Sequence, residues 1–155
     1  MKTKRKVWTI AIAAALATSG AIASAQENEP IKFGLCFDLS KSYTFISPQV
    51  AQAAQDLAMY TNENGGIEGH PVEIIVRDHG NEPQRGVECY EQLKREGVFI
   101  YNFLSTPVTN AALPRAMKDG NILMQSFVGR GDAVDGEVFG WVFPLGPTYW
   151  QQAAN

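Results

Sequence analysis

The sequence has few of the side chains that most often carry out chemistry. Its 155 residues include two histidines and two cysteines. No metal-ligand spacing surrounds His70 or His79, and no serine or cysteine lies in a nucleophile motif. The glycine-rich segments match neither the phosphate-binding loop nor the dinucleotide-binding pattern. These absences indicate a protein without metal or cofactor that is not an enzyme, and a hydrolase using Asp78 and His79 is the weaker alternative.

Long basic runs and long apolar runs are also missing beyond the first 25 residues. The chain has 13 basic and 16 acidic side chains, and its formal charge is −3. An acidic surface without a basic run disfavours nucleic acid and anionic membranes as partners. Each apolar run after Gln26 has only the length of a strand, which is too short to cross a bilayer. We therefore expect this part of the chain to fold outside the membrane.

Basic and apolar residues are instead concentrated at the N-terminus. Residues 2–6 carry four positive charges, and residues 7–23 form an apolar stretch without charge. The triplet Ala23-Ser24-Ala25 then provides the small residues that a signal peptidase requires. We predict that residues 1–25 are a cleavable signal peptide, whose removal changes the formal charge from −3 to −7 and places the protein in the periplasm. The alternative is a retained membrane anchor, which needs roughly 20 strongly apolar residues.

Apolar runs of strand length then alternate with segments of helical periodicity. We expect strands at residues 31–37, 72–78, 98–104, 121–125 and 141–145. We expect helices at residues 48–60, 82–96 and 107–118. Strands that alternate with helices of this length predict an α/β fold, a doubly wound parallel sheet with right-handed crossovers. In such sheets a ligand binds beyond the carboxyl ends of the strands, so the loops that follow the strands form the candidate site.

The triplet Ser105-Thr106-Pro107 follows the third expected strand. We expect Thr106 to cap the third helix, as Asn81 caps the second, and a proline suits the first turn. The free amides and partial positive charge of a helix start suit a carboxylate, and the Ser105 hydroxyl is a further donor. We interpret Ser105 and Thr106 as anion-binding residues. The alternative is an ordinary helix cap, which accounts for Thr106 and leaves Ser105 unexplained.

Two further loops contain aromatic, glycine and cationic residues. Tyr43 and Phe45 follow the first strand, where their rings can cover a small ligand or anchor their own loop. Residues 126–132 combine a hydroxyl, an aromatic ring, two glycines and Arg130. Arg130 can hold a carboxylate through two hydrogen bonds, or it can pair with Asp132 or Asp135 at the surface. Both interpretations are open.

The two cysteines fall on the first expected strand, at Cys36, and on the second expected helix, at Cys89. In an oxidising compartment they can form a disulfide. If the first strand lies between the second and third, the second helix crosses its face and brings the sulfurs together. We nevertheless expect two buried free thiols, because a central strand is seldom bridged to a helix.

Four segments of the sequence resemble a known family. They are residues 31–40, the Asn-Gly-Gly-Ile-x-Gly turn at 64–69, the expected strand at 72–78, and residues 121–126. Together they resemble the periplasmic leucine/isoleucine/valine-binding proteins of ABC transporters, which have the type I periplasmic binding protein fold. Members of that family have two α/β lobes that close on a ligand, and they are longer than this sequence. The resemblance implies that residues 26–146 are the N-terminal ligand-binding lobe of a fragment. Residues 147–155 then begin the crossover into a second lobe.

The resemblance also implies roles for individual residues. Ser105 matches the hydroxyl that binds the ligand α-carboxylate, and Tyr43 lies near the aromatic cover on the first loop. Residues 126–130 match the loop that contacts the α-amino and carboxylate groups, although the family's Ala-Ala-Thr pattern is Val-Gly-Arg here. Beyond the fifth strand, where relatives often have an acidic residue, this chain has Thr-Tyr-Trp. The predicted ligand contacts are Tyr43, Ser105, Thr106, Ser126, Phe127, Gly129, Arg130, Tyr149 and Trp150.

The predicted function is that of a periplasmic substrate-binding protein. It captures a small carboxylate ligand, a branched-chain or other amino acid, by hinge closure and delivers it to an ABC permease in the inner membrane. Arg130, the additional aromatic residues and the lack of a visible acid favour the alternative of an aromatic or other simple carboxylate. A second alternative is the sensor ectodomain of a receptor, which requires a membrane span further along. The full-length protein is expected to be a monomer.

Overall fold

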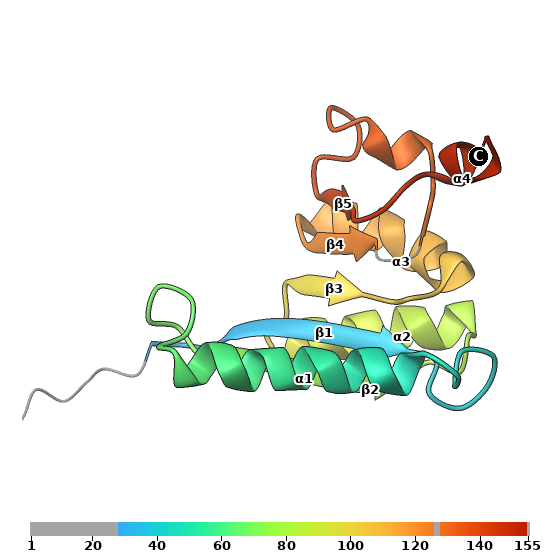
Figure 1. Cartoon of the computed structure of the whole chain (residues 1–155). Coiled ribbons are helices and arrows are strands. Elements are labelled where there is room, and N and C mark those ends of the chain that lie inside the picture. The colour runs from blue at the N-terminus through green and yellow to red at the C-terminus, as the bar shows by residue number, and fades with distance from the viewer. Residues whose placement is uncertain (1–27, 126–127, 155) are drawn as a thin grey trace, which may run out of the picture.

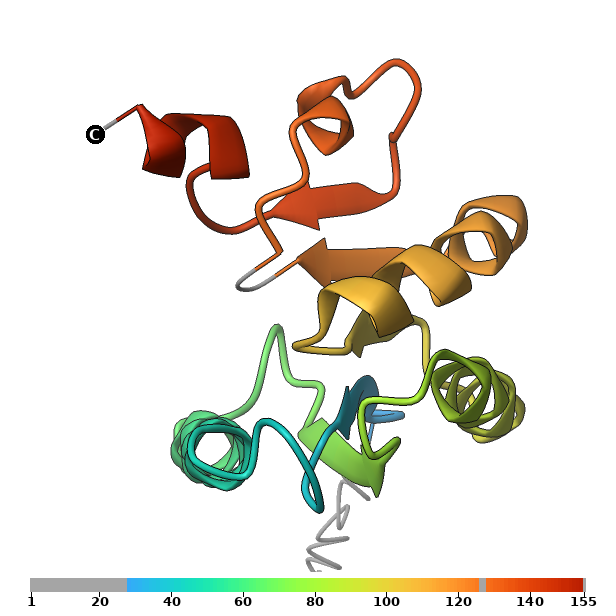
Figure 2. The same cartoon turned by 90° about the vertical axis from the view of Figure 1, so that its right-hand side faces the viewer.

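Five parallel strands form one sheet in the order β2-β1-β3-β4-β5 in the computed structural model, which describes residues 28–125 and 128–154 (Figure 1). The strands are β1 (Ile31–Phe37), β2 (Val72–Asp78), β3 (Ile100–Asn102), β4 (Ile122–Gln125) and β5 (Val142–Pro144). The helices are α1 (Ser47–Glu63), α2 (Pro83–Arg95), α3 (Thr106–Asp119), the 3-10 helix η1 (Asp132–Val134) and α4 (Tyr149–Ala153). Helix α1 covers one face of the sheet, and α2 and α3 cover the other (Figure 2). The predicted doubly wound α/β sheet is confirmed.

Local backbone conformation sets where the elements end. Gly65 and Gly66, which follow α1, have φ angles of 93° and 75°, a region that glycine enters without steric cost. The strand predicted at residues 98–104 is shorter, because Leu104 has a φ of 49° and leaves the extended conformation. Asn81 also has a positive φ, 56°, and α2 is preceded by Glu82, which makes no side-chain cap hydrogen bond. The prediction that Asn81 caps α2 is therefore wrong.

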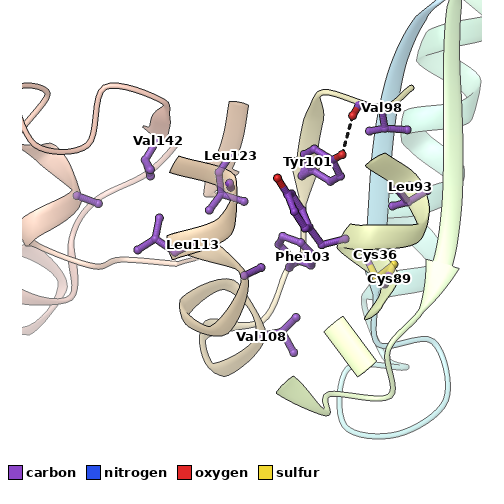
Figure 3. Packing of buried hydrophobic residues seen from close by; sticks show 14 residues of the cluster. Cys36, Cys89, Leu93, Val98, Tyr101, Phe103, Val108, Leu113, Leu123 and Val142 are labelled. Carbon is purple, nitrogen blue, oxygen red and sulfur yellow. Dashed lines mark hydrogen bonds between the residues drawn. A yellow bond between two sulfur atoms is a disulfide. The ribbon is translucent and has the colours of Figure 1, made fainter. Parts of the chain in front are cut away.

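The larger hydrophobic core lies between the sheet and the pair of helices α2 and α3 (Figure 3). The rings of Tyr101, on β3, and Phe103, just after β3, stack nearly parallel in this core, with centroids 6.4 Å apart. A smaller core between α1 and the opposite face of the sheet includes Phe37 and Ala51. Because helices cover both faces of β1, that strand is buried on both sides along its second half, as expected for a parallel sheet.

Cys36 on β1 and Cys89 on α2 form a disulfide within the larger core (Figure 3). The expectation of two free thiols is therefore wrong. The reason is the strand order, which places β1 between β2 and β3, so that α2 passes directly over it. Gly34 allows this close approach, because a Cβ atom there would lie 2.8 Å from Leu93 Cδ1. The two cysteine Cα atoms are consequently 6.5 Å apart, within the range that a disulfide spans.

Some predictions fall on residues that the structure does not describe. These are the signal peptide of residues 1–25 and two proposed ligand contacts, Ser126 and Phe127. Among residues 28–125 and 128–154, no helix has the length and apolar character needed to span a membrane. The C-terminal segment begins α4 with a capping box, in which Thr148 Oγ1 accepts from the Gln151 amide and the Gln151 side chain accepts from the Thr148 amide.

Candidate ligand-binding site

The carboxyl ends of the strands meet at one edge of the sheet, at the right of Figure 1 and facing the viewer in Figure 2. The loops after the five strands and the short helix α4 gather at this edge. Ligands of doubly wound sheets bind at such an edge, because the loops converge there and helix N-termini point toward it. The predicted contacts that are described lie on these loops or at the starts of the helices that follow them.

Helix α3 starts at this edge without a side-chain cap. Its N-cap residue is Ser105, in an extended conformation with φ −150° and ψ 122°, and the Ser105 side chain makes no cap hydrogen bond. The prediction that Thr106 caps the helix is wrong, because the Thr106 hydroxyl lies 2.6 Å from the Tyr149 hydroxyl instead. Pro107 has no amide hydrogen, so the first turn offers the amides of Thr106 and Val108. An uncapped helix start of this kind can hold an anion.

The Ser105 hydroxyl is 2% exposed and donates a hydrogen bond of 2.7 Å to Asn81 Oδ1 in the loop after β2. The amide of Asn81 in turn donates to His79 Nδ1 over 2.8 Å, and His79 Nε2 donates to the Phe103 carbonyl over 3.0 Å. The chain of hydrogen bonds thus links the loops after β2 and β3. It fixes the position of Ser105 relative to the sheet.

His79 is fully buried, and both ring nitrogens are used by backbone groups. Burial lowers the pKa of His79 below its ordinary value, although the hydrogen bond to Phe103 and the charges of Asp38 and Asp78 act in the opposite direction. The ring is held neutral as the Nε2–H tautomer, because the carbonyl can only accept. Neither nitrogen is free to move a proton to a substrate. The geometry gives no support to a hydrolase that uses Asp78 and His79.

This lowered pKa makes the stability of the fold depend on pH. The unfolded chain binds a proton at His79 below about pH 6.5, whereas the folded protein does so only at lower pH. The contribution of His79 to the free energy of unfolding should therefore be fully present above about pH 6.5. It should fall as the pH decreases below that value, by at most about 1.4 kcal/mol per pH unit. Urea unfolding at a series of pH values between about 7.5 and 5 measures the slope. A His79→Gln variant should lose that slope, and an unchanged slope would contradict the assignment.

The loop after β1 is held by Asp38. Its carboxylate, 1% exposed, accepts hydrogen bonds from four successive amides, those of Ser40, Lys41, Ser42 and Tyr43. Burial alone raises the pKa of Asp38, but these hydrogen bonds outweigh burial, so that the pKa lies below its ordinary value. The loop presents the half-buried Tyr43, whose ring centroid lies 6.4 Å from that of Phe45. Tyr43 is thus placed at the strand-end edge on a fixed backbone.

The loop after β4 and helix α4 contact one another closely. The Tyr149 amide donates to the Gly129 carbonyl over 2.6 Å. A Cβ atom on Gly129 would lie 2.7 Å from both the amide nitrogen and Cδ1 of Tyr149, so only glycine allows this approach. Together with the bond between Tyr149 and Thr106, this contact unites three predicted residues from three separate loops. Trp150, also predicted, is 80% exposed at the start of the same helix.

Arg130 makes surface interactions in this structure. Its Nε and Nη2 atoms donate to the two carboxylate oxygens of Asp132 over 2.5 and 2.7 Å, and Nη1 donates to Asn110 Oδ1 over 3.1 Å. The guanidinium also lies 5.4 Å from the ring centroid of Phe139. The hydrogen bond to Asp132 raises the pKa of Arg130. Of the two interpretations of Arg130, the structure shows the pair with Asp132, and a ligand contact stays a prediction.

Two polar side chains at this edge are not among the ligand contacts that the sequence predicts. Asn81, predicted to cap a helix, instead accepts a hydrogen bond from Ser105. Gln125, the last residue of β4, is 1% exposed, and neither of its amide atoms has a hydrogen-bond partner among the described residues. Strand alternation was the available signal, because Gln125 shares the buried face of β4 with Leu123. Gln125 therefore has an unused donor and acceptor immediately before the loop predicted to contact ligand.

The described residues contain no cluster of three or more histidine, cysteine or acidic side chains that could hold a metal ion. What the edge does provide is hydroxyl groups, helix-start amides and aromatic rings. A parallel α/β sheet in this strand order, with helices on both faces, has the type I periplasmic binding protein fold. The sequence profile of the periplasmic binding protein family matches residues 30–155, and the chain belongs to that family.

Solved structures with the same fold include several transporter proteins. The fatty acid ABC transporter substrate-binding protein from Thermomonospora curvata is 28% identical, with a TM-score of 0.66 over 78% of this chain and 30% of that one. The branched-chain amino acid transporter substrate-binding protein from Streptococcus pneumoniae, in complex with isoleucine, is 23% identical, with a TM-score of 0.68 over 77% of this chain and 34% of that one. The ABC transporter solute-binding protein from R. palustris, in complex with benzoate, is 18% identical, with a TM-score of 0.66 over 79% of this chain and 34% of that one.

The chain thus spans about a third of the length of these structures, from 30% to 34%. No curated protein sequence matches it. The complexes with isoleucine and with benzoate, at 23% and 18% identity, show that the fold is shared. They do not identify a ligand of this chain.

Proposed function

We propose that the chain forms the first lobe of a periplasmic solute-binding protein that captures a small carboxylate and delivers it to an ABC permease in the inner membrane. The observation that carries the proposal is the uncapped start of α3, with the buried Ser105 hydroxyl beside it, at the carboxyl edge of the sheet. The action is binding followed by closure of a second lobe over the ligand, without bond chemistry. Family membership and the N-terminal export pattern support a periplasmic location.

In the proposed site the carboxylate lies at the start of α3. The amides of Thr106 and Val108 and the Ser105 hydroxyl donate to it, and the positive end of the helix dipole adds a favourable field. Tyr43 and Tyr149 cover the apolar part of the ligand from the two sides of this edge. Ser126 and Phe127 remain proposed contacts on the loop after β4, and Trp150 extends the aromatic surface.

Gly129 has a different role in this proposal. It allows α4 to approach the loop after β4, since a side chain there would displace Tyr149. Arg130 binds Asp132 within its own segment and Asn110 of α3, and in this proposal these interactions replace direct ligand contact as the role of Arg130. Gly129 and Arg130 are therefore held in place before a ligand arrives.

The acidic side chains at this edge already have partners, and this favours a carboxylate ligand that has no ammonium group. An amino acid ligand needs a negative partner for its ammonium. Asp38 is already occupied by four backbone amides, Asp78 pairs with Arg85 at 3.3 Å, and Asp132 pairs with Arg130. An aromatic or other simple carboxylate therefore fits this lobe better, and an amino acid would need its ammonium partner from elsewhere.

Thermal unfolding of the intact protein with added carboxylates tests this function. The panel contains L-isoleucine, L-valine and benzoate, with isoleucinamide and benzamide as matched controls that lack the carboxylate. A ligand at about 100 times its Kd stabilises the folded state by about 2.7 kcal/mol, which corresponds to a rise in Tm of about 5–10 °C. We expect such a rise with at least one carboxylate and none with its amide. Equal responses to acid and amide, or no response to any carboxylate, would exclude the proposed site.

A further inference from the structure

The hydroxyl group of Ser105 is engaged in a way that conflicts with direct ligand binding. A hydroxyl has one proton, and Ser105 donates it to Asn81 Oδ1 over 2.7 Å. A ligand carboxylate can only accept, so it also requires that proton. Ser105 is 2% exposed, so bulk water has little access to its hydroxyl. Something must change at Asn81 before Ser105 can donate to a carboxylate.

The backbone on both sides of this contact is held firmly. The Asn81 amide is bonded to His79, and His79 is bonded to the Phe103 carbonyl, two residues before Ser105. Asn81 and Leu104 have φ angles of 56° and 49°, in the left-handed region that costs a residue other than glycine about 1 kcal/mol or more. Such conformations persist where the surrounding structure enforces them. The freedom that remains at Asn81 is rotation of its side-chain amide.

We propose that Asn81 is a positioning residue that releases the Ser105 proton to the ligand by a half-turn of its side-chain amide. The turn exchanges Oδ1 for Nδ2, which has the same shape and donates where the oxygen accepted. Nδ2 then donates to Ser105 Oγ, and the Ser105 hydroxyl donates to the carboxylate. The single hydrogen bond between the two side chains is kept with reversed direction, and a second one is gained. The Ser105 hydroxyl keeps a partner for its oxygen and gains one for its proton, which makes this arrangement better than a hydroxyl that simply swings away from Asn81.

This inference rests on the proposed function, because it requires a carboxylate ligand at Ser105. The informative substitution is Asn81→Asp. Aspartate has nearly the same size and also tolerates a positive φ, but its carboxylate has two acceptors and no donor. It should keep the Ser105 proton permanently. Isothermal titration of the intact protein with benzoate, and separately with L-isoleucine, should show affinity roughly 10- to 100-fold weaker than that of the unsubstituted protein.

Asn81→Gly separates positioning from a structural role. Glycine accepts the same backbone conformation and leaves the Ser105 hydroxyl without any competing acceptor. If Asn81 acts by releasing the proton, the glycine variant should bind benzoate within about fivefold of the unsubstituted protein and much better than the aspartate variant. If the bond between residue 81 and Ser105 is only structural, the order is reversed, because aspartate preserves that bond and glycine removes it. The reversed order would overturn the inference.

The negative charge of aspartate also repels a carboxylate directly, and a double-substitution cycle with Ser105→Ala measures this effect. Repulsion acts whether or not Ser105 is present, whereas retention of the proton requires its hydroxyl. The loss caused by Asn81→Asp should be at least about fivefold smaller in the Ser105→Ala background. Equal losses in both backgrounds would leave repulsion as the sole cause and overturn the inference. If the unsubstituted protein binds neither benzoate nor L-isoleucine, it is the proposed function that fails, and the inference fails with it.

Discussion

Replacing both Cys36 and Cys89 with alanine is expected to lower the free energy of unfolding by about 4 kcal/mol. The disulfide closes a segment of 53 residues that contains α1, β2 and the first half of α2. Breaking it increases the conformational freedom of the unfolded chain, and the loop-closure estimate for a segment of this length gives that value. Both cysteines lie in the core, at 0% and 4% exposure, so the substitution also removes buried packing. Urea unfolding monitored by circular dichroism measures the change.

A reducing agent provides the matched control for this prediction. It should destabilise the unsubstituted protein strongly and leave the double-alanine variant unchanged, because that variant has no other cysteine. A difference of less than about 1 kcal/mol between oxidised and reduced protein would contradict the prediction.

The order and type of the elements could be predicted from the sequence because both depend on local patterns. Apolar runs of strand length and the 3.6-residue period located the five strands and the first three helices with small boundary errors. The disulfide could not be predicted in the same way. It depends on the position of β1 between β2 and β3 and on the approach that Gly34 allows, and both are properties of the assembled sheet. The general rarity of strand-to-helix bridges therefore gave the wrong answer.

The candidate site was predictable at the level of loops but not of hydrogen bonds. The rule for strand ends located Ser105, Thr106 and Tyr149 at one edge of the molecule. The partners of these residues depend on backbone angles that the sequence does not show. Thr106 bonds to Tyr149 because the extended N-cap Ser105 takes the cap position, and Asn81 reaches Ser105 because of its left-handed conformation. For Arg130, residue type left pairing with an aspartate and contact with a ligand both open, and the structure shows the pair with Asp132.

Ser105→Ala is expected to weaken carboxylate binding more than any other single truncation on this lobe. A hydrogen bond from a buried hydroxyl to a charged acceptor contributes about 1.5–3 kcal/mol, so Kd should rise roughly 10- to 150-fold. The same change leaves the side chain of Asn81 without its partner, which should lower the free energy of unfolding by about 1 kcal/mol. Isothermal titration with benzoate and L-isoleucine measures the first effect, and urea unfolding measures the second.

Ser47 is the matched control, because it is another buried serine at the start of a helix. It begins α1, is fully buried, and its hydroxyl has no hydrogen-bond partner among the described residues. Removing an unpaired buried hydroxyl should leave stability unchanged or raise it slightly, by up to about 1 kcal/mol. Ser47→Ala should also leave the affinity for the carboxylate unchanged. The contrast isolates the role of Ser105, since the two substitutions delete the same atom from similar surroundings. Equal losses of affinity in both variants would mean that buried serines act through stability, and the carboxylate would then have to be held without Ser105.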